Sequence, residues 1–447
     1  MENKNIVILG AAESGTGAAL LAKKRGMDVF VSDNSTIAPR FKKELQNNQI
    51  DFEEKGHSRD IIMESELVIK SPGIPDRLPL MKALYDNAIP VISEIEFASW
   101  FTEARLICVT GSNGKTTTAS LIYHILKNSG LSVALAGNIG TSFCRHLAEA
   151  EPVENYVLEI SSFQLDHIFS MKADVAVITN ITPDHLDRYN DDFQAYVDAK
   201  FRILNNTTKA DYLVYCADDE TITKELDRLK PDISMHPFSI RHAVKNGAYL
   251  EENKIIFNTD KNPFTMKLEE LALQGRHNTY NSMAAGVAAK LVEIRKESIK
   301  KCLSDFENIE HRLEEVATIH GIRFINDSKA TNINSTWYAL ESMNKPVIWI
   351  AGGLDKGNDY DKLIPVVGEK VKAMICLGKD NESIIGALKH VVEEVYETQS
   401  MTEAVAWAYH LAKNDEIVLL SPACASFDLF ENYEDRGNQF KKAVKRL

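Results

Sequence analysis

Short apolar runs alternate with amphipathic stretches along the first part of the chain. "NIVILG" at 5–10, "DVFVSD" at 28–33 and "SELVIKSPGIP" at 65–75 have the length and composition of buried strands. The segment "GAALLAKKRG" at 17–26 instead repeats apolar residues at helical spacing. Strand and helix patterns that take turns predict βαβ units and a parallel sheet.

The same alternation recurs in two further series. One begins with "LICVTG" at 106–111, after a linker-like helix near 94–105, and includes "NYVLEISS" at 155–162. The other follows the charged connection at 300–315 and includes "KPVIWIAGG" at 345–353 and "EIVLLSPACAS" at 416–426. We therefore predict an α/β protein of three domains with boundaries near 93 and 308, which gives residues 1–93, 94–308 and 309–447.

Composition narrows the class of protein. The 447 residues carry 51 basic and 64 acidic side chains, a formal charge of -13, which argues against binding of bulk nucleic acid or an anionic membrane. Six cysteines without paired spacing predict neither a disulfide framework nor a zinc site. The apolar run at the N-terminus is too short for a signal peptide, and no stretch of about 18 apolar residues is present. We expect a cytoplasmic protein.

The first strand is followed by a turn of the dinucleotide-binding kind. "ILGAAESGTGAA" has glycines at 10, 15 and 17, and Asp33 closes the next strand. Ala12 stands where the dinucleotide fingerprint needs its second glycine, so a bound dinucleotide is disfavoured. The helix N-terminus can still receive a nucleotide phosphate, and a Rossmann-like turn that binds nothing is the alternative.

Residues 108–118, "CVTGSNGKTTT", are typical of a phosphate-binding loop with one departure. The spacing G-x-x-x-x-G-K-[ST] needs a glycine where Val109 stands, so this is either a chance match or a shortened loop. The strand before it and the helical pattern after it favour a loop that binds phosphates. Lys115 would then reach the outer phosphates and Thr116 a magnesium ion. The guanine-reading N-K-x-D motif is missing, so we predict ATP as the nucleotide.

Two strand ends near this loop carry candidate metal ligands. Glu159 ends one strand, where a carboxylate can hold magnesium, although an exposed strand-end glutamate is the alternative. "TPDHLD" places His185 in a loop at the same sheet edge, where it is either a ligand or a surface histidine. In the helix "DDFQAYVDAKFRIL", Lys200 falls in the middle of the apolar stripe. Its amine either reaches out to solvent or is held near the metal and modified.

Later segments place further polar side chains at element ends. Asn278 and Asn281 share one helix face, so both amides can reach one ligand, unless Asn278 only caps the helix. Arg312 lies near the predicted junction at 308, where its guanidinium can close over phosphates. Other candidates follow strands of the last series, namely Asp327, Lys329, Thr331, Lys356 and Ser426.

In this order, "TGSNGKTTT", "GNIG", "LEISSFQL", "TPDHLD", "GRHNTYN", "HRLE", "NDSKATN", "AGGLDK" and "LLSPACASFD" resemble the Mur ligase family over essentially the whole chain. The family's phosphate loop has the short form, so the resemblance also accounts for Val109. It implies a Rossmann-like N-terminal domain for a UDP-linked substrate, a central P-loop ATPase α/β domain and a C-terminal Rossmann-like α/β domain for the amino acid.

The motifs "NDSKATN" and "SPACASFD" are typical of the family member that adds D-glutamate. The resemblance then implies an ATP- and Mg²⁺-dependent amide ligase of peptidoglycan precursor synthesis. ATP would phosphorylate the L-alanyl carboxylate of UDP-N-acetylmuramoyl-L-alanine (UDP-MurNAc-L-Ala), and the amine of D-glutamate would attack the acyl phosphate. The partners are these small molecules, with no nucleic acid and no membrane, and we expect a monomer.

By position, the resemblance also assigns roles to individual residues. The catalytic set is Lys115, Glu159, His185 and Lys200, and the metal set is Thr116, Glu159, His185 and Lys200, the last as its carbamate. The ATP set is Gly111, Asn113, Gly114, Lys115, Thr116, Thr117, Asn278, Asn281, Arg312 and Asp327. The UDP-substrate set is Ser14, Asp33, Ser71, Gly73, Asn138 and His185. The D-glutamate set is Lys329, Thr331, Lys356, Ser426, Phe427 and Tyr433. Ala12 and Tyr433 depart from the family's usual residues at these two positions.

Two other interpretations stay open. One is another ligase of the same family with a different amino acid, although the D-N-P-R motif of the diamino-acid member is absent. The other is a non-catalytic P-loop nucleotide sensor, which would not need Glu159, His185 and Lys200 to lie near Lys115. Release of ADP that depends on the substrates distinguishes an enzyme from a sensor.

Overall fold

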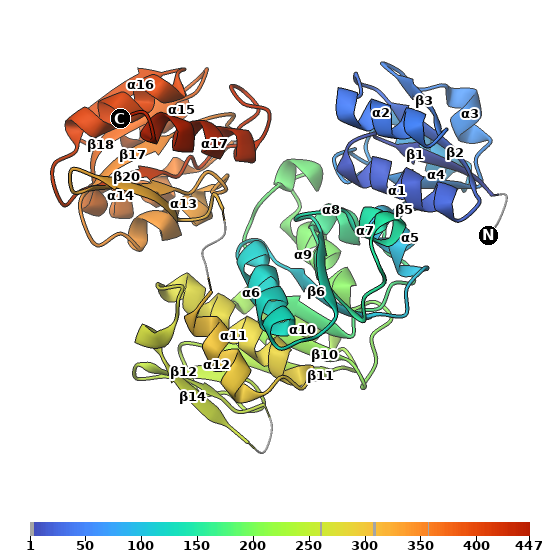
Figure 1. The fold of residues 1–447 in the computed structure, drawn as a ribbon, viewed down its shortest axis with the longest axis horizontal. Helices are drawn as coiled ribbons and strands as arrows, with labels where there is room; N and C mark the ends of the chain where they lie inside the picture. The colour runs from blue at the N-terminus through green and yellow to red at the C-terminus, as the bar shows by residue number, and fades with distance from the viewer. Residues whose placement is uncertain (1–3, 260–261, 307–309, 356) are drawn as a thin grey trace. The chain divides into compact units, whose positions relative to one another are not determined.

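The computed structural model describes residues 4–259, 262–306, 310–355 and 357–447. They divide into two compact units, one of Met1–Leu273 with Asn278–Phe306 and one of Gln274–His277 with Glu307–Leu447. The first unit contains two sheets and the second unit contains one (Figure 1). The prediction of an α/β fold built on parallel sheets is confirmed. The domain boundary at 93 stays a prediction, and the boundary at 308 falls outside the described residues.

The first sheet has five parallel strands in the order β3-β2-β1-β4-β5. Its strands are β1 (Asn5–Leu9), β2 (Asp28–Asp33), β3 (Asp51–Glu54), β4 (Leu67–Lys70) and β5 (Val91–Ser93). Its helices are α1 (Glu13–Lys24), α2 (Pro39–Asn47), α3 (Arg59–Met63), α4 (Pro79–Asp86) and α5 (Glu94–Ser99). Alternate residues of β1 enter different cores, Ile6 and Ile8 in one and Val7 and Leu9 in the other. Apolar residues on both faces are what a parallel sheet covered by helices on both sides requires.

The second sheet has nine strands in the order β14-β13-β12-β11-β10-β9-β6-β8-β7. Its strands are β6 (Arg105–Thr110), β7 (Val133–Gly137), β8 (Asn155–Glu159), β9 (Val175–Ile178), β10 (Tyr212–Cys216), β11 (Ser234–Ser239), β12 (Ala248–Glu251), β13 (Lys254–Phe257) and β14 (Phe264–Lys267). Its helices are α6 (Lys115–Asn128), α7 (Phe143–Glu149), α8 (Ser162–Leu165), α9 (Phe193–Phe201), α10 (Glu220–Leu229), α11 (Arg276–Leu291) and α12 (Lys296–Ser304). Short 3-10 helices are η1 (Leu186–Arg188), η2 (Arg202–Leu204) and η3 (Leu268–Glu270). The pairings of β13 with β12 and β14 are antiparallel, a feature that the sequence analysis did not predict.

The third sheet has the order β15-β16-β20-β17-β18-β19, and only its edge strand β15 is antiparallel. Its strands are β15 (Glu314–Ile319), β16 (Ile322–Asn326), β17 (Val347–Ala351), β18 (Val371–Leu377), β19 (Glu394–Thr398) and β20 (Ile417–Leu420). Its helices are α13 (Ile333–Glu341), η4 (Tyr360–Leu363), α14 (Ile364–Lys370), α15 (Glu382–Leu388), α16 (Met401–Leu411) and α17 (Tyr433–Val444). Along β17, Trp349 packs into one core and Ile348 and Ile350 into the other, so helices again cover both faces.

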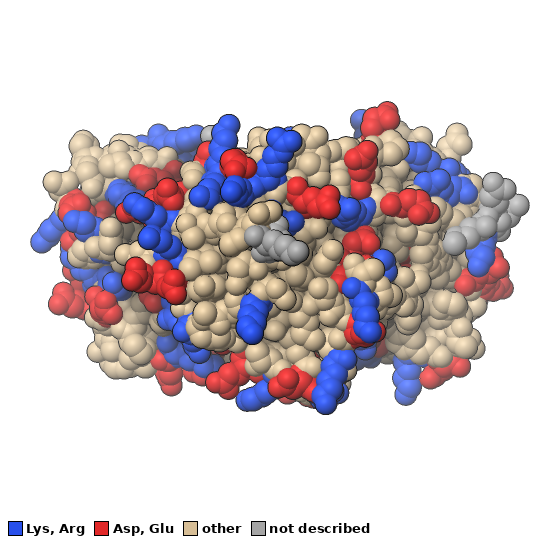
Figure 2. All heavy atoms as spheres, turned by 90° about the horizontal axis from the view of Figure 1, so that it is seen from below, with Lys and Arg blue, Asp and Glu red and all other residues tan. Residues whose placement is uncertain are grey.

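The surface mixes charges of both signs. On the face shown in Figure 2, Lys and Arg side chains are interspersed with Asp and Glu. In the described part of the chain, no helix is both long and apolar enough to cross a membrane.

Candidate functional site

The predicted phosphate loop connects β6 to α6. Gly111 has φ 144° and Gly114 has φ 81°, values that L side chains rarely adopt. Gly114 is the N-cap of α6, so Lys115 begins the helix and the buried Thr116 and Thr117 lie in its first turn. This is the strand, loop and helix arrangement that directs backbone N–H groups toward phosphates. The predicted loop is therefore present in its structural context.

The segment after β9 braces this loop. The Thr179 hydroxyl donates to the carbonyl of Asn113 at 2.6 Å, and the Asn180 side chain both accepts from the Asn113 N–H and donates to its carbonyl. A Cβ on Gly111 would lie 1.9 Å from Oγ1 of Thr179, so only glycine fits there. The sequence analysis missed Thr179 and Asn180. Both directly follow β9, and only the pairing of β9 with β6 shows that they lie against the phosphate loop.

Glu159 is the last residue of β8, the strand on the other side of β6. Its side chain is only 2% exposed, which rules out the exposed strand-end reading. Oε1 accepts a hydrogen bond from the Asn138 amide at 2.9 Å, and the Asn138 N–H donates to the carbonyl of Glu159. A predicted UDP-substrate residue thus contacts a predicted metal ligand. Thr116 and Glu159 supply the hydroxyl and carboxylate oxygens that Mg²⁺ prefers.

Lys200, on α9, points inward. It is 1% exposed, and Nζ donates to the carbonyl of Gly111 at 2.8 Å. The alternative in which its amine reaches out to solvent is therefore wrong. Among the apolar residues of its segment, Val197 and Phe201 are buried, while Phe193 and Leu204 are partly buried and Leu204 lies beyond α9 in η2.

The electrostatics at Lys200 disfavour its charged form. Burial, and next the positive charge of Lys115, hold the pKa of the Lys200 amine well below its ordinary value. Asp184, Asp166 and Glu159 act in the opposite direction. Lys115 is folded back onto its loop, with Nζ donating to the carbonyls of Gly111 and Ser112 at 2.9 Å each. Both amines therefore meet at the Gly111 carbonyl.

The loop after β9 also positions His185 in this unit. His185 has a left-handed backbone, φ 54°, and its ring lies edge-on to Phe163 with centroids 5.3 Å apart. Its Nε2 is 3.8 Å from a carboxylate oxygen of Asp184. The same region is fixed by Tyr196, whose hydroxyl lies 3.0 Å from the Ser112 hydroxyl. Tyr196 was not predicted, although it shares α9 with Lys200.

Asn278 and Asn281 are both buried in α11. The Asn281 amide donates to Oδ1 of Asn278 at 3.3 Å, and its own Oδ1 accepts from the Thr118 hydroxyl. A Cβ on Gly114 would lie 2.4 Å from Oδ1 of Asn281, so this side chain packs directly against the phosphate loop. The capping alternative for Asn278 is wrong, because α11 begins before it, at Arg276.

The predicted UDP-substrate residues of the first sheet gather where the strand order reverses, between β1 and β4. The Ser71 hydroxyl donates to the carbonyl of Gly10 at 3.4 Å, and Ser14 lies in the first turn of α1. The Asp33 carboxylate accepts from the Ala11 N–H at 2.7 Å and therefore fixes this turn. The carbonyl of Gly73 accepts from Arg188 at 3.3 Å. Ligands of open α/β sheets bind at such a reversal.

In the second unit, Asp327 follows β16 and is buried. Its carboxylate accepts from the Ser421 hydroxyl at 2.9 Å and from the Leu313 N–H at 3.2 Å. Burial raises the pKa of Asp327 to about 7, against the opposing effect of the Arg312 charge.

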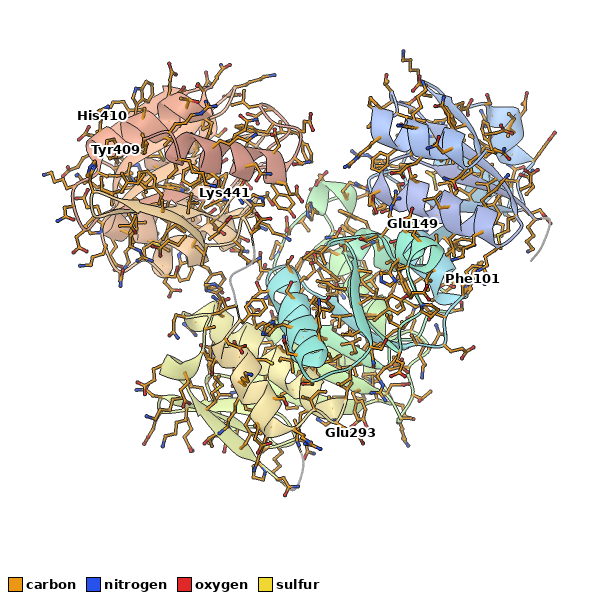
Figure 3. All side chains as sticks on the ribbon, viewed as in Figure 1. Phe101, Glu149, Glu293, Tyr409, His410 and Lys441 are labelled. Carbon is orange, nitrogen blue, oxygen red and sulfur yellow. The ribbon has the colours of Figure 1, made fainter. Side chains whose placement is uncertain are left out.

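The turn that carries Arg312 is fixed on both sides. His311 and Leu313 have left-handed backbones, φ 62° and 44°, and the His311 N–H donates to Glu314 at 2.8 Å. Lys441 of α17, labelled in Figure 3, pairs with Glu310 at 2.7 Å and Glu314 at 3.1 Å. These contacts brace the turn on both sides of Arg312.

Most of the predicted D-glutamate residues follow the neighbouring parallel strands β16 and β20. The Ala423 N–H donates to the carbonyl of Ala330 at 3.0 Å, which joins the two loops. Among the predicted residues, Lys329 has Nζ 5.3 Å from the ring centroid of Tyr433, Thr331 is exposed, Ser426 is buried and Phe427 is 66% exposed. Lys356 lies outside the described residues.

Arg436, on α17, is a buried residue that the sequence analysis missed. It is 1% exposed and donates to the Ser328 hydroxyl at 3.0 Å, the Ser328 carbonyl at 2.9 Å and the Cys424 carbonyl at 3.2 Å. Burial lowers the pKa of Arg436 to about 10. One guanidinium thus joins the loops after β16 and β20. A charged residue in a polar helix gives no sequence signal for such burial.

Comparison with protein families gives three matches along the chain. Residues 5–77 match the MurD N-terminal domain, residues 109–289 the Mur ligase middle domain and residues 311–424 the glutamate ligase domain of Mur ligases. Curated relatives named UDP-N-acetylmuramoylalanine--D-glutamate ligase match end to end. The protein of Christiangramia forsetii is 52% identical over 444 residues, and that of Bacteroides fragilis 52% over 445, each covering 99% of this chain and 100% of the relative.

Solved structures share the fold at lower identity. The UDP-N-acetylmuramate-alanine ligase MurC of Thermotoga maritima is 18% identical with a TM-score of 0.65, covering 99% of this chain and 100% of that one. The MurF ligase of Thermotoga maritima, solved in complex with ADP, is 15% identical with a TM-score of 0.61, covering 94% and 96%.

Proposed function

The chain belongs to the Mur ligase family, and on that premise we propose that it is the ATP-dependent ligase that joins D-glutamate to UDP-MurNAc-L-Ala. The observation that carries the proposal is the full-length similarity to relatives of that name, 52% identical over 99% of this chain. The product is a peptidoglycan precursor, and ATP supplies the energy for the new amide bond. We further infer that the enzyme works as a cytoplasmic monomer.

The first unit supplies the groups needed to activate a carboxylate. The γ-phosphoryl group of ATP passes to the L-alanyl carboxylate, and the amine of D-glutamate then displaces phosphate from the acyl phosphate. Three anionic groups have to approach one another in this reaction, so fixed positive charge stabilises the transition state. Lys115 supplies that charge beside Gly111, and Asn281 places its amide against Gly114 of the same loop, with Asn278 hydrogen-bonded to it. Arg312 and Asp327 are further proposed ATP contacts.

Magnesium is the metal that fits the proposed donor set. Thr116 and Glu159 would hold one ion. Both are buried: Thr116 lies in the first turn of α6, and Glu159 ends β8, the strand beside β6. His185 and Lys200 would hold the other. When bound, the ions supply positive charge that neutralises the phosphates and the developing acyl phosphate.

Lys200 fits a metal site only if its charge changes sign, because an ammonium group would repel a cation. A neutral amine can attack CO₂, forming an N–C bond and releasing a proton, which leaves an anionic carbamate. Burial and the charge of Lys115 both favour the neutral amine at this position. We therefore assign Lys200 a carbamate as its working form.

The second unit carries the proposed amino-acid site. Lys329, Thr331, Ser426, Phe427 and Tyr433 lie in or next to the loops after β16 and β20, and Lys356 completes the set from outside the described residues. Buried Arg436 and the Ala423–Ala330 hydrogen bond hold those loops together. A ligase for another amino acid would use the same phosphate loop. We therefore infer that the second unit determines which amino acid is joined.

One assay tests the proposal against both rivals. Purified protein is incubated with ATP, Mg²⁺, UDP-MurNAc-L-Ala and either D- or L-glutamate, and ADP and the amide product are quantified. We expect ADP and product in equal amounts with D-glutamate only. Turnover with another amino acid in its place would identify a different ligase, and nucleotide binding without substrate-dependent ADP release would identify a sensor.

A further inference from the structure

A second group of side chains with metal-binding chemistry lies between α6 and α12, which pack against each other (Figure 1). His124 is on α6, Cys302 is on α12 and Asp305 directly follows α12. Nε2 of His124 is 3.0 Å from Oδ1 of Asp305, and the imidazole nitrogen, the thiol sulfur and a carboxylate oxygen all lie within 4.8 Å of one another. Within the described ranges, this is the one group of three or more such ligands that are this close.

We propose that His124, Cys302 and Asp305 form a site for a thiophilic divalent cation such as Zn²⁺, with water as the fourth ligand. Tetrahedral zinc with nitrogen, oxygen and sulfur donors holds its ligand atoms about 3.4 to 3.6 Å apart. The His124–Asp305 pair is already slightly closer than that. Because the ligand atoms lie within 4.8 Å of one another, the thiol has to approach by at most about 1.4 Å, which rotation of one side chain can provide.

The three side chains differ in how far they are exposed to solvent, from Asp305 through His124 to the buried Cys302. The side chains of His124 and Asp305 are 27% and 48% exposed, whereas Cys302 is 2% exposed and forms no disulfide. A cation can therefore enter from water between the imidazole and the carboxylate and meet the thiol at the base of the site. The ring of His124 is oriented by Phe306, edge-on with centroids 5.2 Å apart.

Binding exchanges protons for the cation. His124 Nδ1 lies 3.1 Å from the Asn128 amide nitrogen, an arrangement in which Nδ1 accepts and Nε2 donates to Asp305. For Nε2 to bind a metal, the ring proton moves to Nδ1. The Asn128 amide nitrogen also donates to the His124 carbonyl at 2.8 Å, so the amide has to give up that bond before its oxygen can turn to accept from Nδ1–H. Asn128 then becomes the partner that fixes the metal-bound tautomer. The Cys302 thiol releases its proton to solvent as it becomes a thiolate.

The proposed site fastens two helices together and lies away from the phosphate loop. His124 is nine residues beyond Lys115 on the same helix, a separation of about 14 Å. A cation there ties α6, which begins at the phosphate loop, to α12. Cysteine spacing gave no sign of this site, because its histidine comes from a helix that is distant in the sequence.

Cobalt provides the test, since Co²⁺ bound by a thiolate gives a sulfur-to-metal absorption band. The purified full chain is titrated with Co²⁺, and Zn²⁺ is then added to displace it. We expect one thiolate-bound equivalent that Zn²⁺ removes. The band is lost in Cys302→Ser and kept in Cys376→Ser, the same change at another buried cysteine. Ions held by Thr116 and Glu159 do not contribute, because those ligands contain no sulfur.

The other two ligands, the half-buried His124 and the exposed Asp305, give independent variants if Cys302→Ser does not fold. Asp305→Asn and His124→Asn should each weaken Co²⁺ binding by about tenfold or more. Zn²⁺ should also raise the unfolding temperature of the wild type and leave that of Cys302→Ser unchanged. The absence of the band in the wild type, a band that survives in Cys302→Ser, or unchanged affinity in both Asp305→Asn and His124→Asn would overturn the proposal.

Discussion

Replacing Lys200 tests the central chemical inference about the active site. Nζ atoms of Lys115 and Lys200 both donate to the Gly111 carbonyl, so they lie at most about 6 Å apart. Two positive charges at that separation repel by about 3 kcal/mol at an effective dielectric constant of 20. A carbamate on Lys200 reverses the sign and turns the repulsion into an attraction of similar size. Water screens the partly exposed Lys115 and brings both values down.

Lys200→Ala removes the proposed anionic ligand, and we expect kcat to fall on the order of a hundredfold to a thousandfold. Added acetate should restore part of the activity, because a small carboxylate can occupy the space and supply the missing charge. Lys200→Arg should resist rescue, since it keeps the positive charge and fills that space. Lys115→Ala is the matched control, because it lacks a cation and acetate cannot replace one.

Two measurements separate the carbamate from a merely structural lysine. Wild-type protein equilibrated with ¹³C-bicarbonate should show a carbamate carbonyl resonance that is missing in Lys200→Ala and Lys200→Arg. Protonation of the amine at lower pH reverses carbamylation, so wild-type activity should fall on the acid side more steeply than that of acetate-rescued Lys200→Ala. Normal turnover in Lys200→Ala, or a wild type without the resonance, would refute the carbamate.

Three other predictions follow from the same structure. Lys115→Ala should lower product formation by about a thousandfold, because it removes the fixed charge on the outer phosphates, and ADP release checks this. Ser426→Ala should raise KM for D-glutamate several-fold with KM for ATP unchanged, and equal changes in both would place Ser426 outside the amino-acid site. Burial raises the pKa of Glu94 to about 7, so its proton is retained in the folded state and stability falls as pH rises from about 4 to 7. Glu94→Gln should therefore exceed the wild type in unfolding free energy by about 3 kcal/mol above pH 8 and match it near pH 4, as urea denaturation will show.

Helical and strand periodicity predicted the sites that depend on one element. Lys200 was placed inward because its neighbours Val197 and Phe201 are apolar at helical spacing, and burial of all three confirms the reasoning. Glu159 was placed at a strand end beside the phosphate loop, and the β6–β8 pairing puts it there. In both cases a local pattern determines which way the side chain points.

Periodicity failed where burial depends on partners far away in the sequence. Arg436 lies in the polar sequence "YEDRGNQ", yet it is buried because Ser328, 108 residues away, and Cys424 offer carbonyl oxygens from two loops. From the sequence, Thr179 and Asn180 look like ordinary loop residues. Their role in the phosphate loop follows only from the pairing of β9 with β6. The antiparallel strands β13 and β14 likewise follow from pairing that no single segment encodes.

The phosphate loop has a valine, Val109, where the usual loop has its first glycine, and it needs a glycine at position 111 instead. Val109 is fully buried in β6 and pairs with Glu159 on one side and Val177 on the other, so the strand continues through the position where longer loops turn. A glycine there would remove core packing and gain nothing, because the backbone is extended. The turn comes two residues later, at Gly111, where φ is 144° and a Cβ would collide with Thr179. The loop is shorter because the strand is longer, and the glycine is needed where the neighbouring β9 segment approaches the backbone.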